Sequence, residues 1–488
     1  MKSTRKKNYS KWYHEIIEKS ELAEYSGVRG FMIIKPYGYA LWEIIKNELD
    51  KILKNTGHEN VYFPLLIPKS FLEKEKEHME IFSEGCAVVT HSRIKKNEKE
   101  KHLVVDYQSK LREELVIRPT SESIVWNTYQ RWIQSYRDLP ILLNQWGNAV
   151  RWEMRNRLFL RNSEFLWQEG HTAHATKEEA FKETEKMLNV YTNFSKNFLA
   201  IPVIKGIKPH TEKFQGSKMT FCIEALMQDG KSLQMATSHF LGQNFSKAFN
   251  VKFTNYDGTK HYAWGTSWGT STRLIGGLIM SHADDMGLII PPKIAPIQVV
   301  IIPIYHKNIK DHLIDELSTT ILHCLEKQKI RVKYDQRKQF TPGWKFHEYE
   351  MKGIPIRIHI GLKEIKSKII EIVRRDTHEK RSIVIDKIHN IIIKLLEKIQ
   401  NNLYEKSLVR TQQSIIQIDQ YQKFKEQLNG PGGFILSHWD GTDETLKKIQ
   451  KETEATIRCI PFSYGKKQGH CIYSGRVSQQ RVVFSKSY

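Results

Sequence analysis

The chain has 488 residues, 40% of them hydrophobic and 11% aromatic, so it is large enough for several domains with proper cores, and global disorder is excluded. Its 76 lysines and arginines outnumber its 54 aspartates and glutamates, and the net charge of +22 favours a nucleic-acid partner over the alternative, a general surplus of surface lysine. It has no apolar run long enough for a membrane span, no apolar segment behind its basic N-terminus and five scattered cysteines, which argues against a membrane or secreted protein and fits a reducing cytoplasm.

Residues 1–290 mix helical and strand patterns and predict one large α+β unit. WEIIKNELDKILKNTG, residues 42–57, repeats apolar residues at helical spacing and predicts an amphipathic helix that ends at Gly57. VYFPLLIP, residues 61–68, is expected to follow as a short buried strand, and KKNEKEK, residues 95–101, to form a solvated loop.

A helix start is indicated in IRPTSESIVW, residues 117–126. The polar run TSES precedes an apolar run, so Thr120 or Ser121 is placed to cap the helix, with a glutamate nearby. Capping could account for all the polar residues here, and the stretch alone indicates no binding function.

VRWEMRNRLFLRNSEFLWQEGH, residues 150–171, interleaves charges of both signs with aromatic rings. Two antiparallel strands are predicted, NAVRWEM and FLRNSEFLWQEGH, with RNRLF as a flexible basic loop between them. In the first strand, alternation gives a core face of Val150, Trp152 and Met154 and a charged face of Arg151, Glu153 and Arg155. In the second strand, one face carries Phe165, Trp167, Glu169 and His171.

These side chains favour two ligands, one anionic and one zwitterionic. Guanidinium groups suit phosphate, whereas a carboxylate beside an aromatic wall suits a small ammonium ligand. The alternative is a surface hairpin held by cross-strand ion pairs, each worth less than about 1 kcal/mol.

In residues 265–287, Arg273 opens an apolar pattern with helical spacing. A cation in the first turn of a helix is repelled by the helix dipole. An arginine there is therefore easier to explain if it binds an anionic ligand. The alternative is an exposed arginine tolerated at a small cost.

The pattern changes near PPKIAP, residues 291–296. Strands such as IQVVIIPI, IRVKYD, IPIRIHIG and IIEIVRRD then alternate with helical stretches around residues 310–328 and from residue 383, which predicts a separate α/β domain. A helix-rich connector is expected to run to residue 428, and NGPGG, residues 429–433, to begin a final module.

These stretches, in this order, resemble the class II aminoacyl-tRNA synthetases, most closely the prolyl-tRNA synthetases of the archaeal and eukaryotic type. FMIIKPYGYALWEIIKNELDKILKNTGHENVYFPLLIP looks like motif 1 with its proline at Pro64, VRWE through FLRNSEFLWQEGHTAHAT like motif 2, and GTSTRLIGGLIMSHADDMGLIIPP like motif 3 with Arg273. RPTSE, LNQWGNAVRWE, FLWQEGH, TSHFLGQNF and TPGWKFHEYEMKGIPIR single out the proline enzymes. The resemblance covers nearly the whole chain.

The resemblance implies an α+β fold in three parts. Residues 1–290 would form a catalytic domain with a six-stranded antiparallel sheet flanked by helices, residues 295–400 an α/β anticodon-binding domain, and residues 401–488 a small C-terminal α/β module, which ends in a tyrosine in this subtype as it does here. A homodimer built partly through motif 1 is also implied. Motifs 2 and 3 lie too close together for the large editing insertion of the bacterial type, so mischarging with alanine is an expected weakness.

The reaction implied is the ligation of L-proline to tRNA(Pro). The carboxylate of proline attacks the α-phosphate of ATP to give prolyl-adenylate and pyrophosphate, and the prolyl group then passes to the 3′ end of the tRNA. By match to the motifs, Arg151 would contact the α-phosphate and the proline carboxylate, and Arg273 would grip the far end of the triphosphate. The other implied ATP contacts are Glu153, Arg161, Asn162, Gln234, Thr237 and Ser271, with Gln234 also a Mg²⁺ contact.

For proline, the resemblance implies a pocket of carboxylates and rings. The residues that match it are Thr120, Glu122, Arg151, Trp167, Glu169, His171 and His239. In the anticodon-binding domain, phosphate-binding charge would come from Lys333, Arg337, Lys338 and Lys345, and Trp344, Phe346 and Tyr349 could stack on bases.

The chain departs from the family pattern in two places. Many relatives bind zinc through four cysteines in the C-terminal module, whereas HWDGTDETL, residues 438–446, has none and CIYSG keeps only Cys471, with Ser474 in the other position. Zinc is therefore not expected, since one thiolate cannot build a tetrahedral site and Cys459 lies elsewhere. His438 and His470 are conceivable substitutes, but Asp440 and Asp443 suit zinc less well than thiolates. The second departure is RNSEF in place of the expected RTREF, and the serine, Ser163, would reduce the charge at the rim of the motif 2 loop.

Two other functions fit part of the pattern. One is a class II synthetase for another amino acid, against which RPTSE and FLWQEGH argue. The other is a synthetase-like RNA-binding protein without catalysis, against which the intact arginines of motifs 2 and 3 argue.

Overall fold

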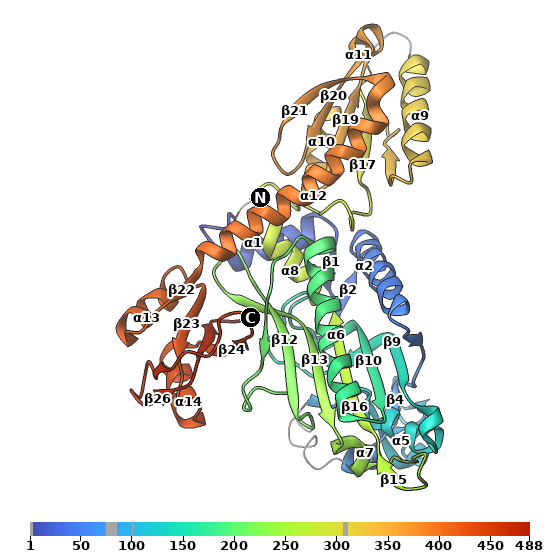
Figure 1. Ribbon diagram of the computed structural model, residues 1–488. Helices are drawn as coiled ribbons and strands as arrows, with labels where there is room; N and C mark the ends of the chain where they lie inside the picture. Colours follow the sequence, from blue (N-terminus) through green and yellow to red (C-terminus); the bar gives the residue numbers. More distant parts are fainter. Residues whose placement is uncertain (1–2, 75–84, 100, 306–310) are drawn as a thin grey trace.

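The computed structural model describes residues 3–74, 85–99, 101–305 and 311–488 (Figure 1). A central body contains the longest sheet, and a five-stranded sheet lies apart from it at one end of the molecule. Helix α12, Ile388–Gln413, runs from that five-stranded sheet to a C-terminal module. Among the described helices, none is both long and apolar enough to cross a membrane.

The main sheet of the central body is antiparallel over six adjacent strands, in the order β11-β12-β13-β16-β10-β9. This arrangement confirms the expected six-stranded antiparallel sheet. A short parallel strand, β3, is added beside β9. The bounds are β3 Glu59–Asn60, β9 Ile141–Val150, β10 Glu164–His174, β11 Ile204–Ile207, β12 Met219–Leu226, β13 Ser232–Gly242 and β16 Trp264–Ser271.

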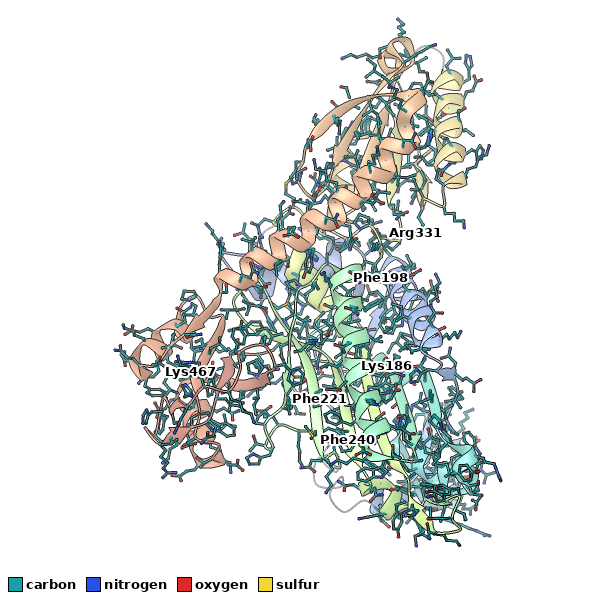
Figure 2. All side chains as sticks on the ribbon, in the orientation of Figure 1. Lys186, Phe198, Phe221, Phe240, Arg331 and Lys467 are labelled. Carbon is teal, nitrogen blue, oxygen red and sulfur yellow. The ribbon has the colours of Figure 1, made fainter. Side chains whose placement is uncertain are left out.

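Helices cover the main sheet and bury its apolar side chains. Helix α6, Lys177–Phe194, packs on β12, β13 and β16. Its Phe181 meets Phe221 and Phe240, labelled in Figure 2, edge-on at ring distances of 5.8 and 5.9 Å. The largest apolar core also takes side chains from α1 Tyr9–Lys19, α2 Pro36–Asn55 and α8 Arg273–His282.

Helix α2 begins before the predicted range of residues 42–57, because Pro36 stands in its first turn, where the missing N–H costs nothing. Gly57 follows the helix with φ +90° and ends it, as predicted. The expected strand over residues 61–68 is wrong for most of its length. Only β4, Leu66–Pro68, is a strand, and Tyr62 is 70% exposed.

Shorter elements complete the central body. The hairpins are β1 Ala23–Tyr25 with β2 Met32–Ile34, β6 Ile94–Lys96 with β7 Leu103–Val105, and β14 Lys252–Thr254 with β15 Lys260–Tyr262. Strands β4, β8 Lys110–Ile117 and β5 Val88–His91 form a small sheet, and the short helices are α3 Lys69–Glu73, α5 Glu122–Trp132 and α7 Asn244–Ala248. The expected loop at residues 95–101 thus begins inside β6, and residue 100 lies outside the described residues.

The five-stranded sheet has the order β18-β17-β19-β20-β21, with β18, β17 and β19 parallel and the last two strands antiparallel. Its elements are β17 Val299–Pro303, α9 Asp311–Lys327, β18 Val332–Tyr334, α10 Pro342–Met351, β19 Ile356–Ile360, α11 Leu362–Ser367, β20 Ile369–Arg374 and β21 Lys380–Val384. Arg331, labelled in Figure 2, ties this part to the central body, because its guanidinium donates to Ala295 O at 2.7 Å and Pro292 O at 2.8 Å. The predicted alternation of strands and helices is confirmed, and residue 310 of the predicted helix lies outside the described residues.

The C-terminal module begins before the glycine-rich stretch that was expected to open it. Strand β22, Ile415–Gln417, and helix α13, Tyr421–Asn429, precede that stretch, and β22 already pairs with β23, Phe434–His438. The remaining elements are α14 Asp443–Thr453, β24 Thr456–Pro461, β25 Gly469–His470, β26 Val477–Ser478 and β27 Arg481–Ser485.

The module continues the main sheet. Strand β24 pairs with β11 through Gly206 and Ile207, which gives an 11-stranded sheet. Gly206 permits this approach, because a Cβ on it would lie 2.7 Å from the Cβ of Cys459. Nearby, the buried Glu224 accepts hydrogen bonds from Lys208 Nζ at 2.9 Å and from Arg458 Nη2 at 3.1 Å. Backbone pairing and buried charge therefore join the two parts.

Candidate active site

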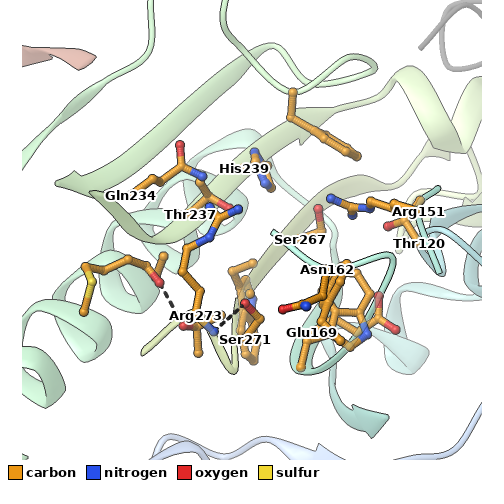
Figure 3. A pocket seen from close by; sticks show the side chains of 18 of the residues that line it. Thr120, Arg151, Asn162, Glu169, Gln234, Thr237, His239, Ser267, Ser271 and Arg273 are labelled. Atoms are coloured by element: carbon orange, nitrogen blue, oxygen red, sulfur yellow. Dashed lines mark hydrogen bonds between the residues drawn. The ribbon is translucent and has the colours of Figure 1, made fainter. Parts of the chain in front are cut away.

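A cavity of about 310 Å³ opens on the main sheet, where β10, β13 and β16 meet the loop 151–163 and the start of α5. Figure 3 shows Arg273 reaching toward Thr237 and Gln234 on one side, with Arg151 beside Thr120 on the other. The structure brings together every residue expected to bind ATP or proline: Thr120, Glu122, Arg151, Glu153, Arg161, Asn162, Trp167, Glu169, His171, Gln234, Thr237, His239, Ser271 and Arg273.

The loop 151–163 differs from the prediction of two long strands. Strand β9 ends at Val150 and β10 begins at Glu164. Beyond Val150 the chain leaves the ladder, since Trp152 N donates to Gly85 O at 2.8 Å. Val150 is buried as expected, but Trp152 and Met154 are 51% and 66% exposed, so the expected core face is wrong for these two residues.

The tip of this loop is anchored rather than flexible. Leu158, Phe159 and Leu160 are buried in the main apolar core. The Arg157 guanidinium lies between the rings of Tyr13 and Tyr488, at 4.9 and 5.1 Å. The expected flexible basic loop is therefore wrong, because three apolar residues at its tip are buried on folding.

Three arginines line the cavity, Arg151, Arg161 and Arg273, and the charges of Arg151 and Arg273 are the more buried. Arg151 Nε donates to Pro119 O at 2.9 Å, and its guanidinium lies 5.5 Å from the rings of Phe165 and Trp167. Burial lowers the pKa of Arg151. Burial, then repulsion from Arg151, lowers the pKa of Arg273 to about 10. Both side chains would gain from a bound anion, because it would offset the cost of burying like charges together.

Arg273 is the first residue of α8, as the sequence predicted. Its backbone N–H donates to Ser271 Oγ at 3.2 Å. A ligand anion at this end of the cavity would also lie near the positive end of the helix dipole, whereas the guanidinium alone opposes that dipole.

The other end of the cavity combines an indole, carboxylates and imidazoles. Trp167, Glu169 and His171 lie on one face of β10, which confirms the predicted alternation. Glu169 Oε2 lies 3.1 Å from His171 Nε2, and Glu169 Oε1 accepts from Gln145 Nε2 at 2.7 Å. Burial lowers the pKa of His171, but the hydrogen bond and charge of Glu169 outweigh it, so the pKa is raised overall.

The polar start of α5 contributes to this end instead of capping its own helix. Ser121 is the N-cap residue, yet its hydroxyl makes no capping hydrogen bond and donates to Glu169 Oε1 at 2.5 Å. The hydroxyl of Thr120 donates to Glu122. Helix capping therefore does not account for these residues, because their hydroxyls are used to orient carboxylates of the cavity.

Several buried polar atoms around the cavity have no hydrogen-bond partner among the described residues. They are Asn162 Nδ2, Trp167 Nε1, His171 Nδ1 and Ser267 Oγ. A buried donor or acceptor without a partner costs about 1–3 kcal/mol. Such groups gathered around one cavity indicate that a polar ligand completes them.

Ser267 is a cavity residue that the sequence analysis did not single out. It lies on β16, directly opposite both His171 on β10 and His239 on β13. A usable signal was present, because strand alternation places Ser267 on the same face as Ser271, which was predicted. Phe214 was also missed, and it lies 4.6 Å from His239 between ring centroids.

The cavity offers little to a metal ion by itself. Over the described parts of the chain, no group of three or more His, Cys, Asp or Glu side chains could hold one. Gln234 lies in the cavity, but Glu224, its partner across β12 and β13, is occupied by Lys208, Arg458 and Ser232. A lone amide oxygen fits an ion such as Mg²⁺ that receives most of its ligands from a phosphate substrate.

The residues that stand where the family pattern has zinc-binding cysteines do not fit a zinc site. Asp440 accepts hydrogen bonds from Ser474 Oγ at 2.7 Å and from Thr445 Oγ1 at 2.8 Å, and Cys471 is buried. One thiolate cannot supply the four ligands of a structural zinc. A hydrogen-bonded cluster occupies the place of the missing cysteines.

Some residues expected to contact RNA are instead part of a core. Lys345 Nζ donates to Asp335 O at 2.9 Å, and Tyr349 OH donates to Asp335 Oδ2 at 3.1 Å. Both side chains are buried, so their predicted contacts with phosphates and bases are wrong. Phe346 is half-buried and stacks on His359 at 4.2 Å. Lys333, Lys338 and Trp344 are exposed.

Three protein-family profiles match the chain. Residues 104–282 match the class II tRNA synthetase core domain for G, H, P, S and T, and residues 298–395 match an anticodon binding domain. Residues 421–488 match the C-terminal domain of prolyl-tRNA synthetase. The three matches follow the order of the central body, the five-stranded sheet and the C-terminal module.

Curated relatives match the chain over its full length. A proline–tRNA ligase of Porphyromonas gingivalis is 55% identical over 484 residues, which cover 99% of this chain and 98% of that protein. One of Flavobacterium johnsoniae is 55% identical over 487 residues, covering 100% of this chain and 99% of that protein. One of Bacteroides fragilis is 55% identical over 488 residues, covering 99% and 98%. With this similarity and these profiles, the chain belongs to the prolyl-tRNA synthetase family.

Proposed function

We propose that the chain is a proline–tRNA ligase, which activates L-proline with ATP and transfers the prolyl group to the 3′ end of tRNA(Pro). The observation that carries this proposal is one cavity in which two arginines with lowered pKa values stand beside an indole and buried carboxylates. Such a cavity suits a polyphosphate and a small amino acid side by side. Membership of the family supports the same reaction.

Arg151 stands where the two substrates would meet. It is flanked by the rings of Phe165 and Trp167, and the charges of Glu122 and Glu169 act on it. There it would hold the α-phosphate of ATP and the carboxylate of proline together. The carboxylate oxygen then forms the bond to phosphorus, and pyrophosphate leaves with the electron pair of the bond that breaks. Positive charge fixed beside the phosphate oxygens stabilises the transition state.

The remaining ATP contacts surround Arg151. Arg273, with Ser271 beside it, would hold the far end of the triphosphate, and Thr237 and Gln234 lie next to it (Figure 3). Glu153, Arg161 and Asn162 come from the loop 151–163 and would hold the nucleotide end. When bound, Mg²⁺ neutralises charge on the β- and γ-phosphates, and Gln234 is the residue that would contact it.

Proline would occupy the end of the cavity formed by β10 and the start of α5. Its ammonium group would meet Glu169 and Glu122 with Thr120 nearby, and its ring would lie against Trp167. His171 and His239 would complete the pocket, and the hydroxyl of Ser267 would find its partner there.

For the tRNA, we propose a catalytic domain over residues 1–290, an anticodon-binding domain over residues 295–400 and a C-terminal module over residues 401–488. The profile match at residues 298–395 supports the second part. Lys333, Lys338 and Trp344 are exposed there and suit phosphates and an unstacked base.

We further propose the domain arrangement of the archaeal and eukaryotic type. Between β10 and β16 the chain forms α6, η4 Ser195–Leu199, β11 to β13, α7 and the β14–β15 hairpin, with short connections, so an editing insertion has no place there. A C-terminal module is what the resemblance implies for this type, and residues 421–488 match the C-terminal domain of prolyl-tRNA synthetase. The relatives above come from bacteria, so the arrangement is not limited to archaea and eukaryotes.

A cytoplasmic homodimer is part of the proposal. Apolar side chains near the motif 1-like segment are exposed, among them Tyr62 at 70%, Val88 at 49% and Leu66 at 38%. A second copy would cover them, and light scattering of the purified chain would show twice the monomer mass.

Proline-dependent exchange of pyrophosphate into ATP tests the proposed reaction. We expect exchange with proline and ATP, and charging of tRNA(Pro) when the tRNA is added. Exchange that depends on another amino acid would reject the specificity, and no exchange with any amino acid would reject the enzyme.

A further inference from the structure

The turn of the N-terminal hairpin packs on the loop 151–163. Residues 26–31 connect β1 with β2, and Arg29 Nη2 donates to Met154 O at 3.0 Å. The Phe31 ring meets the Trp152 ring edge-on at 5.9 Å. A segment far away in the sequence thus contacts the outgoing arm of the loop that would hold the nucleotide.

Ser163 joins this turn to both arms of the loop. Its N–H donates to Gly30 O at 2.8 Å, and its carbonyl accepts from Arg151 N at 2.7 Å. Its hydroxyl oxygen accepts from Glu153 N at 3.1 Å. The side chain is completely buried. One small residue therefore fixes the backbone of Arg151 and Glu153, whose side chains line the cavity.

The fit between Ser163 and the turn leaves no spare space. Gly30 has φ +89°, and a Cβ on it would lie 2.2 Å from Ser163 Oγ and 3.0 Å from Ser163 Cβ. A large side chain at position 163 has no room on this side, because the turn fills it. The expectation that Ser163 lies at the rim of the loop is therefore wrong.

We propose that Ser163 is a positioning residue for ATP, which holds Arg151 and Glu153 in place through hydrogen bonds while seated against the turn 26–31. This inference rests on the proposed function. Ser163 acts through its neighbours and does not itself line the cavity. The amino-acid end should depend little on the Ser163 hydroxyl, because that hydroxyl binds Glu153 N, whereas Arg151 N is bound by the backbone carbonyl of Ser163. Trp167, Glu169 and His171 are held by the pairing of β10 with β9 and β16.

The substitution Ser163→Ala tests this inference, because it leaves Glu153 N without its acceptor. We expect the KM for ATP in pyrophosphate exchange to rise about 3- to 10-fold, the effect of one hydrogen bond, with the KM for proline changed less than about twofold. The matched control is Ser195→Ala, since Ser195 is buried and donates to Ile201 O at 2.9 Å away from the cavity. Ser195→Ala should lower thermal stability by about as much as Ser163→Ala does, without changing the KM for ATP or for proline.

Two outcomes would overturn the inference. One is an equal rise in both KM values, which indicates general damage to the fold, and the other is no change in the KM for ATP. The dissociation constant of ATP, measured by calorimetry, makes the same comparison without turnover. If the chain binds ATP but does not activate proline, the proposed function is rejected. The dissociation constants of ATP for the wild-type chain and Ser163→Ala would still test the role of Ser163.

A second pair of variants tests the packing of Ser163 against the turn 26–31. Gly30→Ala should weaken ATP binding more than Ser163→Ala does, because the new Cβ collides with Ser163. In a Ser163→Gly background the same change should cost less than in the wild-type chain, since both colliding atoms of Ser163 are gone. If the effects of Gly30→Ala and Ser163→Gly on ATP binding are purely additive, the packing of Ser163 against the turn does not position ATP.

Discussion

The cavity of the main sheet and the cluster around Asp335 near the five-stranded sheet contain the same kinds of side chain, but their hydrogen bonding differs. In the cluster, Asp335 accepts from Arg337 Nε at 2.9 Å and from Tyr349 OH at 3.1 Å, and its carbonyl accepts from Lys345. Around the cavity, buried atoms such as Trp167 Nε1 and Ser267 Oγ have no partner within the described part of the chain. The cluster is complete without a ligand, whereas the cavity is not.

This difference separates a structural cluster from a binding site better than composition does. Basic and aromatic residues close in sequence were expected to contact ligands in both regions. The prediction is wrong for Lys345 and Tyr349 because their polar atoms are already bonded to Asp335 inside the protein. Variants that remove one group from each region test this difference.

The largest effect is expected from Asp335→Asn. The change removes the carboxylate that pairs with the buried Lys345 and leaves the Arg337 guanidinium with Glu348 alone, so the free energy of unfolding should fall by about 3–5 kcal/mol. Urea unfolding of the full chain measures this. A loss below about 1 kcal/mol would mean that the cluster is not structural.

Arg151→Gln should lower activity rather than stability. The rate of proline-dependent pyrophosphate exchange should fall about 100- to 1,000-fold, because a charge beside the reacting phosphate is lost. Stability should stay the same or rise, since burial of the guanidinium is unfavourable without a ligand. Arg337→Gln is the matched control, and it should lower stability while leaving the exchange rate intact.

A smaller effect is expected from Ser267→Ala. The variant removes a hydroxyl that has no partner among the described residues, so stability should not fall, while the KM for proline should rise about 5-fold through a lost hydrogen bond of about 1 kcal/mol. Ser437→Ala is the control, because Ser437 is buried and donates to Ile418 O at 2.7 Å. It should lose stability with no change in KM, and the reverse pattern in the two variants would contradict the comparison.

The smallest effect concerns pH. Glu169 raises the pKa of His171 above its ordinary value of 6.5, so the pair stabilises the fold while the imidazole is charged. This stabilisation is fully present below pH 6.5 and is lost as the pH rises through the raised pKa. Unfolding measured from pH 6 upward should therefore show a decline that His171→Gln removes. An unchanged pH profile in the variant would exclude His171 as its source.

Local patterns predicted much of the fold and of the site. The alternation in β10 placed Trp167, Glu169 and His171 on one face, because strand geometry depends only on neighbouring residues. Helix α8 and the helix stop at Gly57 were also predicted from local signals. The residues that the resemblance implied for the site line one cavity, since some lie on β10, β13 and β16, which are adjacent in the main sheet, and the others on the loop 151–163 and at the starts of α5 and α8.

Contacts between distant segments were not predictable from the sequence alone. The tip of the loop 151–163 is held by Tyr13, whose OH donates to Leu158 O at 2.8 Å. The hydroxyl of Ser121 caps nothing because Glu169 lies within reach. In each case a partner far away in the chain overrides the local preference, and no periodicity in the sequence marks that partner.

The pairing of β24 with β11 has a consequence for how the protein is made. The ribosome completes β11, Ile204–Ile207, long before β24, Thr456–Pro461, is synthesised. During that interval β11 presents an open edge that other chains could pair with. The C-terminal module therefore covers the edge of β11 late in synthesis and extends the sheet to β22. A chain truncated before β24 should aggregate even though every residue of its cavity is present.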